Sequence, residues 1–348
     1  MRAIAVTPGH AGSAGLDDRA PPPEHDGSVL VDTLAIGVCG TDAEIISGAY
    51  GWAPPGESRL VIGHESLGRV RAAPDGSGIA PGDLVVGIVR RPDPVPCPNC
   101  AVLEWDMCRN GRYTERGIKE LHGYASDQYR IEPQFAVRVD PSLEDVGVLL
   151  EPASVVAKAW EHVARIGDRA RWRPRKVLVT GAGPIGLLAA MLGVQRGLDV
   201  HVLERVTDGP KPTLVTDLGA TYHAGDVAAC AADSDVVIEC TGVGQLVFDV
   251  MEHTAPGAIV CLTGVSSGGR SLGVDAGALN REMVLGNESV FGSVNANRRH
   301  YVDAAEALAR ADHSWLARLI TRTVAVDNWQ SALERRPDDV KVVVTFAP

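Results

Sequence analysis

Short apolar segments separated by glycine and proline occupy roughly the first 140 residues of the chain. They cover residues 2–6, 28–38, 60–70, 83–89 and 136–139. Short strands at close spacing, with turn residues between them, are typical of an antiparallel, barrel-like unit. Residues 90–111 have few strand-forming residues and are rich in proline and cysteine, so we expect them to form an excursion from that unit.

The hydrophobic pattern changes near Leu149. Apolar side chains in 152–166 recur at helical intervals, and Pro152 stands near the helix start, where its missing N–H costs little. Strand and helix patterns then alternate over residues 176–180, 186–195, 200–204, 236–239 and 258–262. Such alternation favours a parallel sheet flanked by helices. We expect a further helix at 297–310 and a closing strand at 340–346.

Length and composition limit the classes of function. A chain of 348 residues has room for two domains with separate cores, and 45% hydrophobic with 22% charged residues is typical of a soluble globular protein. The net charge of −11 excludes nucleic acid and anionic membranes as expected partners. Glycine and proline interrupt the uncharged stretch 177–194, which argues against a membrane span. Seven cysteines and the lack of a signal-peptide pattern predict a cytoplasmic protein.

The run Gly181-Ala182-Gly183-Pro184-Ile185-Gly186 follows a predicted strand and opens a predicted helix. In this setting the first glycine makes the turn, the second lets the backbone approach a pyrophosphate, and the third allows close packing. The N-terminus of the helix favours the anion. Glu204 ends the next predicted strand 18 residues after Gly186, close to the expected offset of about 20. We therefore predict a dinucleotide site.

Glu204 also bears on which dinucleotide is bound. A carboxylate at this place accepts hydrogen bonds from the adenosine ribose and repels a 2′-phosphate, which predicts NAD in preference to NADP. Arg205 complicates this prediction, because a guanidinium pairs with a 2′-phosphate or stacks on adenine. NADP therefore stays open, as does a solvent-facing Glu204 with no role in binding.

Cys39, His64, Glu65 and Glu151 are candidate metal ligands. Zinc accepts thiolate, imidazole and carboxylate ligands, and a catalytic zinc keeps one position open for water or substrate. Each residue alone has a plain structural explanation. Cys39 suits a small core position, His64 and Glu65 suit the end of a surface strand, and Glu151 suits the first turn of a helix. Their combination predicts a catalytic zinc site.

Several motifs, in this order, resemble the zinc-dependent medium-chain dehydrogenase/reductase superfamily over essentially the whole chain. They are Gly-Val-Cys-Gly-Thr-Asp at 37–42, Gly-His-Glu at 63–65, Gly-Asp at 82–83 and the loop 181–186. Other segments are similar, more narrowly, to the glucose dehydrogenases of archaea and related bacterial enzymes. These segments are 89–92, 114–118, 122–123, 151–152 and 292–295.

The resemblance implies an α/β protein built from two domains. A GroES-like β-barrel catalytic domain, residues 1–153 and 298–348, is joined to a Rossmann cofactor domain with a doubly wound parallel sheet, residues 154–297. The resemblance also implies an active site in the cleft between the two domains. We expect a homodimer or a homotetramer.

The same resemblance implies roles for individual residues. Cys39 and His64 correspond to zinc ligands, and Glu65 and Glu151 bind the metal directly or through water. Thr41 corresponds to the hydroxyl that relays the substrate proton. Residues expected to contact sugar hydroxyls are Glu115, Glu151 and His300. Residues expected to line the nicotinamide site are Thr241, Gly242, Val265 and Asn295.

Two positions depart from the superfamily pattern. Many alcohol dehydrogenases have a relay histidine five residues after the zinc cysteine, but Glu44 stands there in this chain and leaves the route of the proton open. Cys97, Cys100 and Cys108 resemble the last three of four structural zinc cysteines, and Pro94 stands at the place of the first. Asp93 or another nearby carboxylate is the candidate fourth ligand, and a lobe without zinc is the alternative.

The expected function is zinc-dependent oxidation of an aldose such as glucose at C1 to the lactone, with hydride transfer to NAD(P)⁺ and a preference for NAD. Zinc lowers the pKa of a bound hydroxyl. Carboxylates at Glu115 and Glu151 suit a polyhydroxylated substrate, because a wrong ligand leaves polar groups unpaired. A polyol or secondary-alcohol dehydrogenase is the alternative on the same scaffold, and a non-catalytic dinucleotide- or zinc-binding protein is the more distant one.

Overall fold

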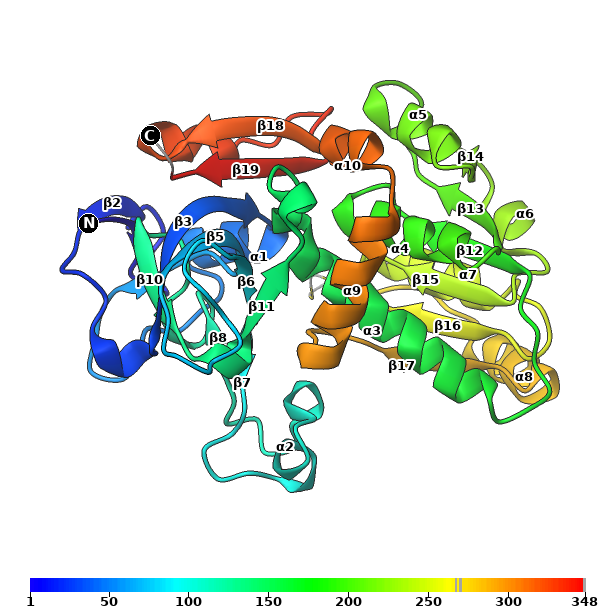
Figure 1. Cartoon of the computed structure of the whole chain (residues 1–348). Helices are drawn as coiled ribbons and strands as arrows, with labels where there is room; N and C mark the ends of the chain where they lie inside the picture. The colour runs from blue at the N-terminus through cyan, green and yellow to red at the C-terminus, as the bar shows by residue number, and fades with distance from the viewer. Residues whose placement is uncertain (267, 269–270, 347–348) are drawn as a thin grey trace. The chain divides into compact units, whose positions relative to one another are not determined.

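The computed structural model describes residues 1–266, 268 and 271–346. Val155–Val294 form one compact unit, and the chain before and after this segment forms the other. Figure 1 follows the chain through both units by colour. The functional domain limits expected from the sequence, at 153/154 and 297/298, stay a prediction. Among the described residues, the helices are all too short or too polar to cross a membrane.

Antiparallel pairing dominates the first unit. Its strands are β1 (Arg2–Val6), β2 (Gly15–Asp18), β3 (Val29–Val38), β4 (Leu60–Val61), β5 (Glu65–Ala72), β6 (Leu84–Gly87), β7 (Arg90–Arg91), β8 (Thr114–Arg116), β9 (Glu120–Leu121), β10 (Gln128–Ile131), β11 (Ala136–Val139), β18 (Ile320–Ala325) and β19 (Lys341–Thr345). One sheet has the order β2-β1-β4, a second has the order β11-β6-β5-β3-β19-β18 with β10 beside β3, and a third has the order β7-β8-β9. The pairs β18–β19 and β8–β9 are parallel.

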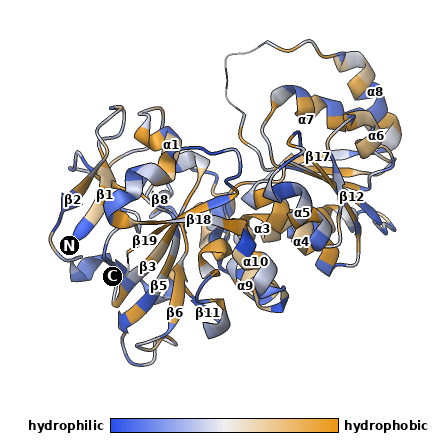
Figure 2. Cartoon of the chain, turned by 90° about the horizontal axis from the view of Figure 1, so that it is seen from above, coloured by the Kyte–Doolittle hydropathy of each residue, from blue (hydrophilic) through white to orange (hydrophobic). Residues whose placement is uncertain are grey.

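Few helices accompany these sheets. They are α1 (Gly40–Ile46), α2 (Pro98–Ala101), α9 (Arg298–Arg310) and α10 (His313–Leu319). Figure 2 shows that hydrophobic residues gather along β3 and β6. Alternate residues of β3, among them Val29 and Val31, are fully buried, as expected for a strand with one face on a core. The predicted antiparallel unit is therefore confirmed in its strand content.

The prediction of one continuous strand over 60–70 is wrong. The chain leaves β4 after Val61 and enters β5 at Glu65. Gly63 has a φ of 87°, and a Cβ at this position would lie 2.9 Å from Cβ of Ala125. The left-handed backbone at this glycine interrupts the strand. As a result, His64 stands in the short connection between strands of two different sheets rather than within a strand.

The second unit contains the predicted parallel sheet, with the strand order β14-β13-β12-β15-β16-β17. The strands are β12 (Lys176–Thr180), β13 (Asp199–Leu203), β14 (Thr221–His223), β15 (Val236–Glu239), β16 (Ile259–Leu262) and β17 (Ser289–Gly292). The helices are α4 (Pro184–Gln195), α5 (Pro210–Asp217), α6 (Val227–Ala231), α7 (Gly244–Met251) and α8 (Ala276–Gly286). Leu178, Val237 and Val260, on three neighbouring strands, belong to one buried core cluster. The near-continuous apolar sequence of these three strands is typical of strands covered on both faces.

Helix α3 (Leu150–Gly167) starts in the first unit and continues into the second. The sequence predicted this helix over 152–166. Glu151 and Pro152 occupy its first turn, where the absent N–H of proline leaves no bond unmade. The structure therefore places Glu151 on a helix that is fixed at its start.

Candidate active site

The Cys39 thiol is held at the N-terminus of α1. Strand β3 ends at Val38, and Cys39 is the residue that caps the helix. Its Sγ accepts a hydrogen bond from the backbone N–H of Thr41 at 3.3 Å, and its own N–H donates to Oδ2 of Asp42 at 3.0 Å. This reciprocal cap fixes the direction of the thiol before any ligand binds.

His64 faces Cys39 from the break between β4 and β5. Its Nε2 lies 3.1 Å from Sγ of Cys39, and its Nδ1 lies 3.5 Å from Oδ1 of Asp42. Nδ1 of His64 and Oδ1 of Asp42 have no other hydrogen-bond partner within the described residues. A carboxylate behind one ring nitrogen orients the other nitrogen toward a metal. The sequence prediction missed Asp42, although a capping acid three residues after the cysteine is a local signal that points to it.

Glu65 is clamped by a lysine that comes from the far end of the chain. Lys341 Nζ lies 2.7 Å from Oε1 and 2.5 Å from Oε2 of Glu65, and it also donates to the carbonyl of Val38 at 3.2 Å. Both side chains of the pair are buried. A Cβ at position 37 would lie 2.1 Å from Oε2 of Glu65, so the carboxylate needs Gly37 beside it.

The charges at this site favour a cation. Burial disfavours the protonated imidazole, but the facing Cys39 and Asp42 outweigh burial and raise the pKa of His64 well above its ordinary value. Burial alone would also lower the pKa of Lys341, but the Glu65 carboxylate outweighs it and raises that pKa. Burial raises the pKa of Glu151 to about 7, and the neighbouring Glu65 acts in the same direction.

The donor set fits zinc. One ligand atom from each of Cys39, His64 and Glu65 lies within 4.8 Å of the others. Sulfur, nitrogen and oxygen donors in one group are those of mixed catalytic zinc sites. Within the described residues this group does not include Glu151, although the charges of His64 and Glu65 both act on the pKa of Glu151. The structure therefore brings together three of the four predicted ligands, and a role for Glu151 through water stays a proposal.

The predicted sugar contacts have defined surroundings. Oε1 of Glu115 accepts hydrogen bonds from Nε of Arg90 at 3.0 Å and from Nδ2 of Asn295 at 2.8 Å. Asn295 therefore contacts a predicted sugar-binding residue, whereas the sequence placed it at the nicotinamide. His300 is fully buried in the first turn of α9, where its Nδ1 accepts from the N–H of Asn297 at 3.1 Å. The structure gives His300 a helix-capping role, and its contact with sugar stays a prediction.

The three lobe cysteines form a second group of donors, each within 4.8 Å of the others. Cys97 caps α2, and the N–H groups of Arg109 and Cys100 lower its pKa to about 6. Burial raises the pKa of Cys100 to about 11. Asp93 does not belong to this group within the described residues; its Oδ2 lies 3.8 Å from Nε of Arg112. Three thiols suit zinc, and Asp93 as the fourth ligand stays a proposal.

The glycine loop fits a dinucleotide. Gly181 has a φ of 86°, and a Cβ on Gly186 would lie 1.8 Å from the carbonyl oxygen of Gly181. A Cβ on Gly183 would meet nothing within 4 Å, which leaves open space above the start of α4. Gly181 thus makes the turn, Gly186 allows the close packing contact, and Gly183 leaves a free approach for a pyrophosphate. Pro184 and Ile185 then form the first turn of α4.

Glu204 lies beside this loop. Its Oε2 accepts from the N–H of Ala182 at 3.2 Å and from Nζ of Lys211 at 2.9 Å, and its Oε1 accepts from the N–H of Arg205 at 2.8 Å. Burial would raise the pKa of Glu204, but these donors, Lys211 first, lower it overall. The carboxylate is thus charged, as a ribose-binding carboxylate must be. Lys211 places a cation next to it that the sequence prediction did not consider.

Thr241, Gly242 and Val265 gather at the carboxyl edge of the same sheet. A Cβ on Gly181 would lie 2.9 Å from Cγ2 of Thr241. Gly242 has a φ of 65°, and a Cβ there would lie 2.4 Å from the carbonyl oxygen of Val265. Dinucleotides bind outside the carboxyl ends of the strands in such sheets. These three predicted residues are therefore brought together next to the glycine loop.

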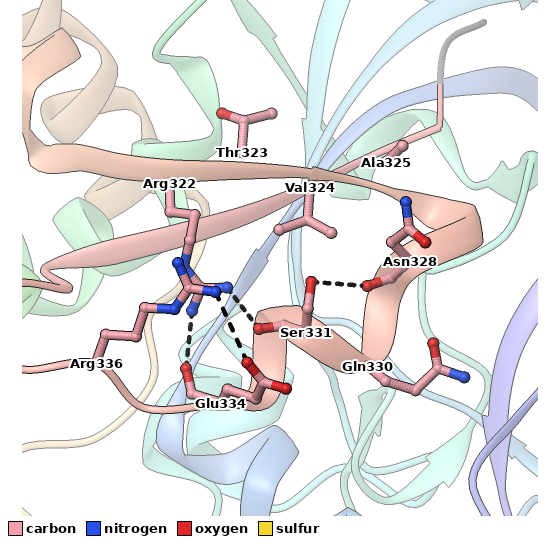
Figure 3. A pocket seen from close by; sticks show the side chains of 9 residues that line it. All are labelled: Arg322, Thr323, Val324, Ala325, Asn328, Gln330, Ser331, Glu334 and Arg336. Atoms are coloured by element: carbon pink, nitrogen blue, oxygen red, sulfur yellow. Dashed lines mark hydrogen bonds and ion pairs between the residues drawn. The ribbon is translucent and has the colours of Figure 1, made fainter.

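A wide surface hollow of about 550 Å³ lies in the first unit and includes none of the predicted site residues. Figure 3 shows its lining, in which the guanidinium of Arg322 is bound by the carbonyls of Ser331 and Glu334. The same guanidinium pairs with Asp339 at 2.7 Å. The guanidinium of Arg322 is therefore already bound within the protein.

A thiol, an imidazole and a carboxylate in a strand-rich domain, together with a glycine loop on a doubly wound sheet, define a zinc-dependent medium-chain dehydrogenase. Residues 25–141 match the alcohol dehydrogenase GroES-like domain, and residues 144–346 match the glucose dehydrogenase C-terminus. The chain belongs to the glucose dehydrogenase family. The predicted superfamily, the GroES-like domain with a parallel sheet, and the class of NAD(P)-dependent zinc dehydrogenase are thereby confirmed.

Relatives cover the whole chain. Glucose 1-dehydrogenase 2 of Vulcanisaeta moutnovskia is 41% identical over 350 residues, which include 99% of both chains. Glucose 1-dehydrogenase of Methanocella arvoryzae is 39% identical over 355 residues, again with 99% of both chains covered. A structure of Haloferax mediterranei glucose dehydrogenase in complex with NADP, zinc and gluconolactone has a TM-score of 0.92 and 33% identity over 100% of both chains.

Proposed function

We propose that this chain oxidises glucose or a closely similar aldose at C1 to the lactone and passes the hydride to NAD⁺ in preference to NADP⁺. The observation that carries this proposal is the group of Cys39, His64 and Glu65 within 4.8 Å, in a chain whose full-length relatives are glucose 1-dehydrogenases. Bound zinc would polarise the C1 hydroxyl as a Lewis acid and lower its pKa.

The chain's own residues hold the ion and move the proton. Cys39 and His64 are the fixed ligands, and Asp42 keeps Nε2 of His64 directed at the ion. Glu65 would be shared between the ion and Lys341, which already holds both of its oxygens. Thr41 would relay the hydroxyl proton: its Oγ1 accepts that proton and passes its own hydroxyl proton on to solvent water. Burial raises the pKa of the Glu151 carboxyl, which favours a role in holding a proton near the ion.

Glu115 supplies a preorganised acceptor for a sugar hydroxyl. Arg90 and Asn295 fix its carboxylate through Oε1, and the side chain is buried. A buried acceptor left without a donor is costly, so an alcohol that lacks the matching hydroxyl binds poorly. This is the physical reason to expect a sugar rather than a simple alcohol. Glu151 and His300 are proposed as further contacts.

A substrate panel tests the proposal. Steady-state kinetics would be measured with aldoses, polyols and secondary alcohols, with NAD⁺ and NADP⁺ in parallel. We expect the highest kcat/KM for an aldose and a lactone as the product. A higher value for a polyol would overturn the choice of substrate, and a lack of cofactor reduction with every alcohol would overturn the reaction.

The preference for NAD rests on Glu204, and its removal gives a prediction. Glu204→Gln removes the negative charge that opposes a 2′-phosphate and releases Lys211 to pair with it. We expect the ratio of kcat/KM for NADP⁺ to that for NAD⁺ to rise by about tenfold or more. Asp208→Asn, which removes an exposed charge from the same loop, is the matched control and should leave the ratio nearly unchanged. A wild-type preference for NADP⁺, the cofactor named for the Haloferax structure, would contradict the proposal.

The lobe cysteines give a prediction about metal content. We propose that Cys97, Cys100 and Cys108 hold a second zinc, with Asp93 as the fourth ligand. Metal analysis should then find two zinc ions per chain, and Cys100→Ser should retain one of them together with aldose oxidation. One zinc per chain in the wild-type protein would count against the second site.

A cytoplasmic homodimer or homotetramer is also part of the proposal.

A further inference from the structure

Strand β15 ends in a carboxylate that the metal centre and the glycine loop do not explain. Glu239 is the last residue of the strand and is 0% exposed. Its neighbour β12 also contributes the glycine loop, and β16 lies on its other side (Figure 1). A buried carboxylate is costly unless its oxygens are hydrogen-bonded, so its surroundings are informative.

The carboxylate is saturated by neutral donors. Oε1 accepts from Oγ1 of Thr180 at 3.1 Å, from the N–H of Thr241 at 2.7 Å and from Oγ1 of Thr241. The N–H of Gly242 lies 3.2 Å from both oxygens. All of these groups donate, so both carboxylate oxygens are hydrogen-bonded inside the protein. Because hydroxyls and amides carry no net charge, the negative charge is held in place without being cancelled.

Glu239 also joins the ends of three strands. Its backbone carbonyl accepts from the N–H groups of Thr263 at 2.8 Å and Gly264 at 3.1 Å, which follow β16. A Cβ on Gly264 would lie 2.1 Å from the N–H nitrogen of Gly242 and 2.8 Å from Oε2 of Glu239. The loops after β15 and β16 are therefore pressed against each other around this carboxylate. Thr180 connects the same carboxylate to the end of β12.

This position is the topological switch point of the sheet. The chain builds β12, β13 and β14 outward in one direction and β15, β16 and β17 outward in the other. A dinucleotide lies across the carboxyl edge at such a point. The inference that follows rests on the proposed function in one respect: the nicotinamide is taken to lie against Thr241, Gly242 and Val265.

We propose that the buried charge of Glu239 makes the nicotinamide site bind the oxidised cofactor more strongly relative to the reduced one. The oxidised nicotinamide ring carries a positive charge, which hydride uptake removes. A fixed negative charge at the edge of a low-dielectric interior attracts the cationic ring and has no matching attraction for the neutral one. Glu239 is thus a positioning residue whose charge strengthens binding of the oxidised cofactor and leaves binding of the reduced cofactor nearly unchanged.

Dissociation constants for NAD⁺ and NADH test this proposal without any sugar. Glu239→Gln keeps the size of the side chain and removes the charge. We expect the ratio of the NAD⁺ constant to the NADH constant to rise by about tenfold. Asp235→Asn is the matched control, because Asp235 accepts from two backbone N–H groups at the amino end of the same strand. Its ratio should match that of the wild-type protein.

Variants that keep the charge separate electrostatics from packing. Glu239→Asp and Thr180→Val disturb the hydrogen bonds but leave a carboxylate, so both dissociation constants should change together. They supply the test if Glu239→Gln does not fold. A changed ratio in either variant, or an unchanged ratio in Glu239→Gln, would overturn the inference. Wild-type protein that binds neither NAD⁺ nor NADH would instead overturn the proposed function.

Discussion

His64→Ala is expected to lose catalytic zinc and aldose oxidation together. The imidazole is held between Cys39 and Asp42, and in the proposed site it is a direct zinc ligand that alanine cannot replace. Loss of an outer-shell partner already costs about 10- to 100-fold in metal affinity, so loss of a ligand should cost more. Zinc content after gel filtration and the initial rate with glucose, measured on the same sample, check this expectation.

Glu65→Gln is the contrasting variant. The amide keeps the volume beside Gly37, and Cys39 and His64 still hold the ion, so most of the zinc should stay while the rate falls. The zinc content of Asp42→Asn should lie between those of His64→Ala and Glu65→Gln, because this change alters only the group behind Nδ1 of His64. Equal zinc loss in His64→Ala and Glu65→Gln would contradict the assignment of one fixed and one exchanging ligand.

Lys341→Met should destabilise the metal-free protein by about 3–5 kcal/mol, because it leaves the buried carboxylate of Glu65 without its partner. The loss should be smaller with zinc present, because the released carboxylate can then bind the ion. Chemical denaturation monitored by fluorescence, with a chelator and separately with excess zinc, measures both values.

Two further variants test whether the loss of stability in Lys341→Met comes from the unpaired buried charge. The double variant Lys341→Met with Glu65→Gln removes the unpaired charge, so most of the lost stability should return. Arg310→Met breaks an exposed pair with Glu306 and should cost at most about 1 kcal/mol. A loss in Lys341→Met no larger than that in Arg310→Met would mean that the buried pair has no special role.

Features that depend on residues close together in the sequence were predictable. The glycine loop needs a strand, a turn and a helix within a short segment, so Gly181, Gly183 and Gly186 were found from spacing alone. Cys39 and His64 were found because each ends or interrupts an apolar segment. The parallel sheet followed from alternating strand and helix patterns.

Features that depend on distant parts of the chain were not predictable. Lys341 is 276 residues from Glu65, and a lysine at the start of a closing strand reads as an exposed residue. Glu239 reads as the polar end of an apolar strand, and its carboxylate is bound by Thr180 at the end of β12 as well as by Thr241 in the loop after β15. The break before Glu65 was also missed, because the close approach of Ala125, which leaves no room for a Cβ on Gly63, is made by a distant part of the chain. In each case tertiary contacts decide what local pattern cannot.

Transfer of deuterium from C1 tests the central claim most directly. Zinc-loaded enzyme would be incubated with glucose deuterated at C1 and NAD⁺, and the reduced cofactor would be examined by mass spectrometry. We expect one deuterium in the cofactor for each lactone formed, and no transfer after a chelator has removed the zinc. Reduced cofactor without deuterium, or transfer that continues in the zinc-free enzyme, would contradict oxidation at C1 on this metal centre.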